Sequence, residues 1–346
     1  KAQEYGSITG AWTIEWEGEE ITLQQASLIL KRQDREKRQK AWTAINEARM
    51  QDAEKLDELY NELVGLRHQV ALNAGFSNYR DYKFKELGRF DYSVSDCFDF
   101  HESIRESILP LVKEQVKDRQ DKLGYDTLRP WDMSVDPEGK DPLHPFKDGK
   151  ELTDVSIEAF DKIDPYFGGC IATMDKLGHL DLDSRKGKAP GGYNYPLYEI
   201  GVPFIFMNAV GSHRDLVTMF HEGGHAIHSF LTRDLELTGF KGTPSEVAEL
   251  ASMTMELVSM DEWHRFYKNE EELMRAKREQ IKTSVSILPW IALIDHYQHR
   301  VYERPEMNIS ERQQLWLDLE SQYDSGLVNW DGLEQYKPTS WHRQLH

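Results

Sequence analysis

Two histidines four positions apart, His221 and His225, are the residues of this 346-residue chain best suited to binding a metal ion. The apolar residues around them predict a helix, on which positions i and i+4 lie on the same face. The two imidazole rings can therefore converge on one ion. Glu222 directly follows the first histidine, where its carboxylate can reach a zinc-bound water and act as a general base. This spacing is typical of zinc-dependent hydrolysis.

Such a short pattern also occurs by chance on exposed helices. Gly223 and Gly224 favour a functional motif, because two glycines inside a helix cost about 1–2 kcal/mol relative to alanine. The close approach of another backbone or of a substrate would account for them. We interpret His228, on the same face one turn later, as a packed residue or a partner of a ligand. A fourth protein ligand is not expected, because catalytic zinc keeps one position open for water.

The segment after residue 242 offers a third ligand. Thr243, Pro244 and Glu246 predict the start of a helix, with Thr243 as the N-cap and Pro244 as its first residue. Glu249 follows one turn later among uncharged residues, and a carboxylate in apolar surroundings needs a partner. We expect Glu249 to bind the zinc ion. Glu256 lies two turns further on, and we expect it to orient one of the histidines; the alternative is a solvent-exposed position.

The elements that must position these residues are mainly helical. Four stretches have apolar residues at helical spacing; they are residues 20–74, 93–123, 155–177 and 212–322. Residues 178–208 differ, because they combine a turn-rich run with a strand-like segment at 202–207. The sequence therefore predicts a mainly α protein, a large helical body with one small β-sheet beside the zinc-binding helix.

The chain divides by composition into three parts. Residues 1–124 form a helical N-terminal portion, residues 125–150 an irregular connection rich in Pro, Gly and Asp, and residues 151–346 a zinc-binding catalytic portion. The length is sufficient for a substantial core.

Charge and cysteine content restrict the partners and the compartment. The formal net charge is −18, which argues against nucleic acid or an anionic membrane as a partner. No apolar run approaches the ~18 residues of a membrane span, and no signal peptide is recognised. Cys97 and Cys170 are too few for a disulfide framework, so we expect buried thiols and a cytoplasmic location.

Together these residues resemble a known family, the thimet oligopeptidase and oligoendopeptidase F zinc metallopeptidases. Residues 221–228 (HEGGHAIH) look like its central motif, and residues 244–252 (PSEVAELAS) look like the segment with its glutamate ligand. Gly192 and Tyr193 lie in a turn that is similar to its substrate-facing edge. The resemblance begins at about residue 24 and covers most of the chain.

The resemblance implies a function and a ligand set. The zinc ion would be held by His221, His225 and Glu249, and short peptides would be cleaved in a deep channel between helical halves. Gly192 and Tyr193 would contact the substrate. The expected protein is a zinc-dependent endopeptidase.

The C-terminal end departs from the family pattern. In the family, a histidine near this end precedes closely spaced tyrosines that bind substrate and stabilise the oxyanion. Residues 341–346 look like the start of that segment, and the chain stops at His346. We therefore expect His346 to contact substrate, the catalytic portion to be truncated, and the remaining piece of the same peptidase to be a candidate partner. Tyr323 or Tyr336 could supply the oxyanion donor only if the fold brings them near.

Two alternatives to an active peptidase stay open. One is a zinc-containing fragment or scaffold that lacks turnover because the tyrosine segment is missing. The other is a metal-free helical interaction module in which the motif is a coincidence. His296 and His299 form a further pair, three residues apart on a predicted helix. They are interpreted as core or surface histidines rather than a second metal pair, because no further acid-rich or cysteine-rich partner is apparent.

Overall fold

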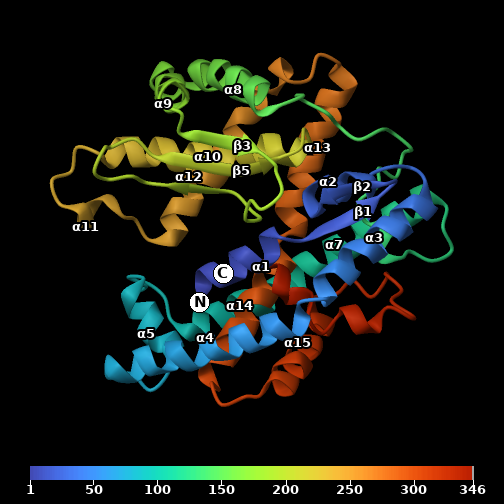
Figure 1. Cartoon of the computed structure of the whole chain (residues 1–346), viewed down its shortest axis with the longest axis vertical. Helices are drawn as coiled ribbons and strands as arrows, with labels where there is room; N and C mark the ends of the chain where they lie inside the picture. Colours follow the sequence, from blue (N-terminus) through green and yellow to red (C-terminus); the bar gives the residue numbers. More distant parts are fainter. Residues whose placement is uncertain (345–346) are drawn as a thin grey trace. The chain divides into compact units, whose positions relative to one another are not determined.

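The chain forms two compact units in the computed structural model, which describes residues 1–344. Unit 1 combines residues 1–141 with the segment that begins at residue 281, and unit 2 consists of residues 142–280. The first boundary falls inside the irregular connection expected at 125–150. The C-terminal segment folds with the N-terminal portion and does not extend the unit that contains His221. Figure 1 shows the elements along the chain.

Unit 1 is built mainly from helices, as the periodicity predicts. Its α-helices are α1 (Ala2–Gly10), α2 (Leu23–Ile29), α3 (Arg35–Met50), α4 (Ala53–Asn73), α5 (Tyr79–Glu86), α6 (Val94–Ser103), α7 (Leu109–Leu123), α14 (Leu288–Glu303) and α15 (Ile309–Tyr323). A π-helical stretch, Ile104–Ile108, joins α6 to α7. Pro110 has no N–H for the regular bond to Glu106, which favours such an irregularity at this place.

A two-stranded antiparallel sheet in unit 1 was not predicted. Strands β1 (Thr13–Trp16) and β2 (Glu19–Thr22) are joined by Glu17 and Gly18, both with positive φ. Such a turn suits the twist of a tight hairpin. Helix α2 consequently begins only after Thr22, whose side chain caps it.

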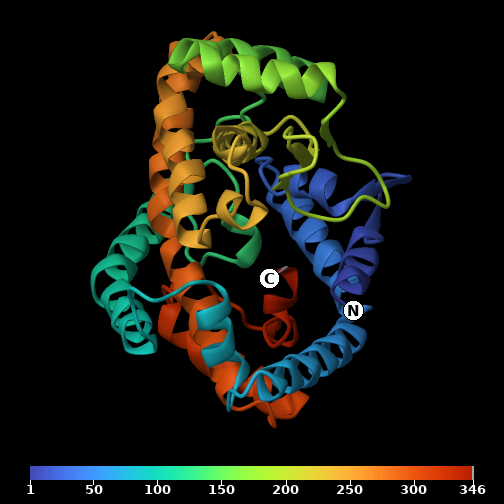
Figure 2. The same cartoon turned by 90° about the vertical axis from the view of Figure 1, so that its left-hand side faces the viewer.

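The C-terminal helices of unit 1 supply its largest core. Helix α14 contacts α4, α5, α6 and α15, and Figure 2 shows α14 and α15 among the helices of the N-terminal half. Tyr297 and Trp316 are almost fully buried there, with their rings 5.3 Å apart. Short 3-10 turns at Glu334–Tyr336 and Ser340–Arg343 follow, and Trp341 joins the same core.

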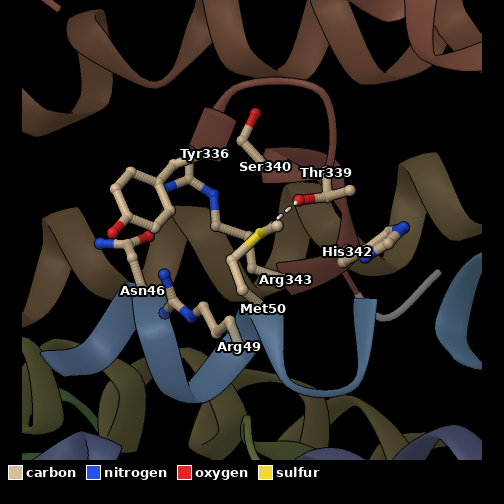
Figure 3. Close-up of a pocket in the computed structure, with 8 residues that line it drawn as sticks. All are labelled: Asn46, Arg49, Met50, Tyr336, Thr339, Ser340, His342 and Arg343. Carbon is tan, nitrogen blue, oxygen red and sulfur yellow. Dashed lines mark hydrogen bonds between the residues drawn. The ribbon is translucent and has the colours of Figure 1, made fainter. Parts of the chain in front are cut away.

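A small pocket of unit 1 lies between the end of α3 and the C-terminal turns. Figure 3 shows its lining, which consists of Asn46, Arg49, Met50, Tyr336, Thr339, Ser340, His342 and Arg343. His342 is held by Asp57, whose Oδ1 lies 2.9 Å from its Nε2. Burial and the neighbouring Arg343 lower the pKa of Arg49 to about 10.

Unit 2 consists of a three-stranded sheet and the helices that pack around it. Its elements are α8 (Gly149–Ile163), α9 (Pro165–Lys176), β3 (Leu180–Asp183), β4 (Tyr193–Tyr195), β5 (Phe204–Ala209), α10 (His213–Thr232), α11 (Thr238–Lys241), α12 (Ser245–Val258), a 3-10 helix Ser259–Arg265, and α13 (Glu270–Ser286), which runs on into unit 1. Figure 1 shows α8 and α9 side by side, next to the strands. Among the described residues, no helix is both long and apolar enough to cross a membrane.

The predicted sheet lies next to the motif helix. The strand order is β3-β5-β4, with β3 parallel and β4 antiparallel to β5. Strand β5 alternates in burial, and Ile205, Met207 and Ala209 point into the core of unit 2. Both β5 and β4 contact α10. The central strand therefore supports the motif helix, while β4 stands at the edge of the sheet.

Helix α10 begins where the sequence predicts. Ser212 and Asp215 form a reciprocal capping box, in which Ser212 Oγ accepts from the Asp215 N–H and Asp215 Oδ2 accepts from the Ser212 N–H. The helix is amphipathic, and Leu216, Met219 and Phe220 are completely buried.

The two glycines of the motif lie where neighbouring helices come closest. A Cβ atom on Gly224 would lie 2.9 Å from the Cα of Ser252 on α12, and one on Gly223 would lie 2.5 Å from the ring of Phe160 on α8. Real Cβ contacts are longer than these distances. The glycines are therefore required by protein packing, and at Gly224 the neighbour is another backbone.

We predict that Gly224→Ala destabilises the protein by about 1–3 kcal/mol, because the overpacked methyl group must push α12 away. Gly65→Ala is the matched control, since Gly65 also lies inside a helix but an added Cβ there would have no atom within 4 Å. The control should be neutral or stabilising by up to about 1 kcal/mol. Urea unfolding of both variants measures the difference, and equal stabilities would contradict the packing role.

Candidate metal centre

The side chains of His221, His225 and Glu249 converge in unit 2. His221 Nε2 lies 3.3 Å from Glu249 Oε2, and His225 Nε2 lies 3.6 Å from Glu249 Oε1. One ligand atom from each of the three residues lies within 4.8 Å of the others. Atoms bound at about 2.0–2.1 Å around a tetrahedral zinc ion are roughly 3.3 Å apart, so the three donors fit such an ion.

Glu256 and Gln280 hold the ring of His221. Glu256 Oε1 lies 2.7 Å from His221 Nδ1, and Gln280 Nε2 donates to Glu256 Oε2 over 2.6 Å. The bond to Nδ1 directs Nε2 towards Glu249. Glu256 is the residue expected to orient a histidine. Gln280 was missed, because a glutamine 24 positions along the chain on α13 gives no sequence signal of its own.

The surroundings of Glu249 differ from those expected. Its side chain is half exposed and lies on a face of α12 where Leu250 is 68% and Met253 is 40% exposed. The partners of Glu249 are polar groups, the two histidines and Ser252 Oγ, which donates over 3.1 Å. The inference from an apolar environment was therefore wrong, although the residue does face the histidines.

The start of α12 also differs by one residue. The helix begins at Ser245, Pro244 is the N-cap, and no side chain provides a capping hydrogen bond. The predicted cap at Thr243 was therefore wrong. The helix still presents Glu249 and Glu256 on the side that faces α10, because they are seven residues, or two turns, apart.

Glu222 is enclosed beside the histidines. Only 5% of the residue is exposed. Burial raises the pKa of its carboxyl, although the nearby histidines and a hydrogen bond from the backbone of Asn194 oppose the rise. Gly192, just before β4, lies so near that an added Cβ would be 3.5 Å from Glu222 Oε1. The expected substrate-contacting turn thus adjoins the carboxylate of Glu222.

Three carboxylates make the metal-free centre strongly favour positive charge. Burial alone would lower the pKa of His221, but its hydrogen bonds to Glu249 and Glu256 and the charge of Glu222 raise it to about 10. The two histidines in turn hold the pKa of Glu249 well below its ordinary value. Without a metal ion, the protonated imidazole of His221 supplies the positive charge that the carboxylates favour.

The tyrosines that the sequence offers for substrate contact or oxyanion stabilisation each have neighbours of their own. Tyr193 is 46% exposed on β4, and its ring stacks on Phe206 at 4.9 Å. Within unit 1, the hydroxyl of Tyr323 lies 3.1 Å from His296 Nδ1, and Tyr336 lines the pocket of Figure 3. His346 lies outside the described residues.

Comparisons with known proteins identify the relatives of this chain. The model of peptidase family M3 matches residues 28–342. The chain is 27% identical over 164 residues to an oligoendopeptidase F homolog of Lactococcus lactis subsp. lactis, covering 47% of this chain and 27% of that protein. It is 24% identical over 258 residues to oligopeptidase A of Escherichia coli, covering 58% and 37% of the two chains.

The fold is similar to that of a solved peptidase. The structure of PZ peptidase A with an inhibitor superposes with a TM-score of 0.94 and 28% sequence identity, covering 100% of this chain and 61% of that chain. The chain thus spans less than two thirds of the length of these relatives.

We predict that His221 makes the stability of the metal-free protein depend on pH. Below pH 6.5 the ring is protonated in both the folded and the unfolded state, so its stabilising contribution is complete; this contribution is lost as the pH rises through about 10. Glu256→Gln removes one of the charges that raise the pKa. The stability difference between wild type and this variant should therefore shrink from pH 6.5 to pH 10 in urea unfolding. A difference that is constant with pH would contradict this account.

Proposed function

The chain belongs to peptidase family M3, and from this we propose that it is a zinc-dependent endopeptidase that hydrolyses peptide bonds in short peptides. The observation that carries the proposal is the convergence of two imidazoles and a carboxylate beside the buried Glu222. The relatives named oligopeptidase support short peptides as the substrates. A cytoplasmic location stays a prediction.

We assign the zinc ligands to His221, His225 and Glu249. The donor set is the combination of two histidines and one carboxylate that suits catalytic zinc and leaves a position for water. A zinc ion bound there supplies Lewis-acid chemistry, polarising a peptide carbonyl and acidifying a water molecule. Glu256 and Gln280 would hold His221 in the orientation that ligation needs, with Nε2 towards the ion and Nδ1 hydrogen-bonded.

Glu222 would carry the proton during hydrolysis. It is adjacent in sequence to a ligand, and its raised pKa brings it closer to neutral pH, where a general base can also return the proton. The carboxylate would take a proton from the attacking water and deliver it to the leaving amine. No feature of residues 1–344 favours a scaffold without turnover over this role.

Strand β4 would position the substrate. It is an edge strand, and an extended peptide can add to such an edge through main-chain hydrogen bonds. Tyr193 is exposed on this strand, and Gly192 leaves space next to Glu222. A peptide bound along this edge would bring its main chain close to Glu222.

Glu222→Gln tests the proposed base most sharply. Glutamine has nearly the same size but cannot accept the proton, so kcat should fall by about 10²- to 10⁴-fold. Zinc content should not change, because Glu222 is not assigned as a ligand. Hydrolysis of a quenched fluorescent peptide, with and without a chelator, provides the measurement. Unchanged chelator-sensitive hydrolysis by the variant would contradict the role.

Zinc binding should release a proton, so that the affinity for zinc depends on pH. At pH 7 the metal-free protein holds a proton on His221, which zinc must displace. The Kd for zinc should therefore fall roughly tenfold for each unit of pH rise between pH 6 and pH 8. Calorimetry in buffers of different ionisation enthalpy counts the protons. Release of none in wild type would contradict the assignment of His221 as a ligand.

A further inference from the structure

A second group of potential metal ligands lies in unit 1, between α6 and α14. Cys97 and His101 project from α6, and Asp295 and His299 project from α14. One ligand atom each from Cys97, Asp295 and His299 lies within 4.8 Å of the others. Each pair is four residues apart on its helix, so both members lie on one face. We call these four residues the α6–α14 cluster.

Two distances in this cluster equal two distances in the candidate metal centre. His299 Nε2 lies 3.3 Å from Asp295 Oδ2, the same separation as between His221 Nε2 and Glu249 Oε2. His101 Nε2 lies 2.7 Å from Asp295 Oδ2, as Glu256 lies from His221. The longer distance suits two neighbouring ligands, and the shorter one suits a hydrogen bond that holds a ligand in place.

The two imidazoles are enclosed, while the cluster as a whole has an open side. His101 is 1% and His299 is 3% exposed, and the ring of Phe98 lies 5.6 Å and 5.2 Å from them. Neither Nδ1 has a hydrogen-bond partner among the described residues, so no other bond fixes which nitrogen of these rings carries the proton. Asp295 remains 42% exposed, which leaves a path for an ion from solvent.

His296 is not part of this ligand group. Its Nδ1 lies 3.1 Å from the hydroxyl of Tyr323, and its ring stacks on His101 at 5.0 Å. Burial, with the nearby His101, lowers its pKa to about 4. His296 is therefore a core histidine, whereas His299 lies beside Asp295 of its own helix and beside Cys97, which is far away in the sequence.

We propose that Cys97, Asp295 and His299 bind a divalent metal ion of the zinc type, with His101 holding Asp295 in place. A thiolate combined with an imidazole and a carboxylate is a ligand set that suits Zn²⁺ and disfavours Mg²⁺ and Ca²⁺. Water would complete the coordination from the open side. The ion would fasten α6 to α14 immediately before the π-helical stretch Ile104–Ile108.

Cobalt tests this site independently of the proposed peptidase centre. Co²⁺ bound by a thiolate gives a charge-transfer band in the near ultraviolet, and His221, His225 and Glu249 include no sulfur. Adding Co²⁺ to the full, metal-stripped chain should produce this band. Cys97→Ser should abolish it, and Cys170→Ser is the matched control that should keep it, because Cys170 belongs to the core of unit 2.

Zinc analysis and a second variant complete the experiment. Cys97→Ser should lower the zinc bound per chain by one equivalent and remove the rise in melting temperature that this zinc gives. His299→Ala keeps the thiol, so it should weaken and shift the cobalt band; circular dichroism checks that both variants fold. Absence of the band in wild type, or its persistence in Cys97→Ser, would overturn the proposal whether or not zinc binds at His221.

Discussion

Helices α10 and α12 pass so close to each other that only a glycine fits between them at Gly224, where a side chain would meet the backbone at Ser252. This contact fixes how far α12 stands from the motif helix. It places Glu249 opposite His221 and His225, at 3.3 Å and 3.6 Å. It also brings Glu256 to the other nitrogen of His221. A wider spacing between the helices would separate these groups.

The balance of charge gives the same centre its preference for a cation. Glu222, Glu249 and Glu256 surround two imidazoles, and together they raise the pKa of His221 to about 10. In a metal-free protein this proton reduces the repulsion among the carboxylates. A divalent ion could replace it with more charge, which is why proton release and metal binding should be coupled. The burial of Glu222 then gives one carboxylate a raised pKa while Glu249 stays ionised.

The helical class, the start of α10 at about residue 212 and a small sheet beside α10 could be predicted from the sequence, because they depend on local periodicity and on turn residues. Glu249 was also predicted as a zinc ligand, but on the argument that its surroundings are apolar, and they are not. Its face of α12 is largely exposed, and its partners are histidines. Periodicity cannot tell which face of a helix is covered by a neighbour.

Contacts between segments that are far apart in the chain could not be predicted from the sequence. The β1–β2 hairpin was not predicted, because its strands have only four residues each and β2 overlaps the stretch from residue 20 that was predicted to be helical. Gln280 reaches Glu256 only through the packing of α13. Cys97 lies about two hundred positions before Asp295 and His299, so its proximity to them follows only from the packing of α6 on α14. His346, expected to contact substrate, is outside the described residues.

The most direct test of the central claim is anomalous diffraction at the zinc edge from crystals of the zinc-loaded protein. The account predicts a strong peak within bonding distance of His221 Nε2, His225 Nε2 and a carboxylate oxygen of Glu249, with Glu222 nearby but not bound. A well-ordered structure without density between these three side chains, or with an ion held by Glu222, would contradict it.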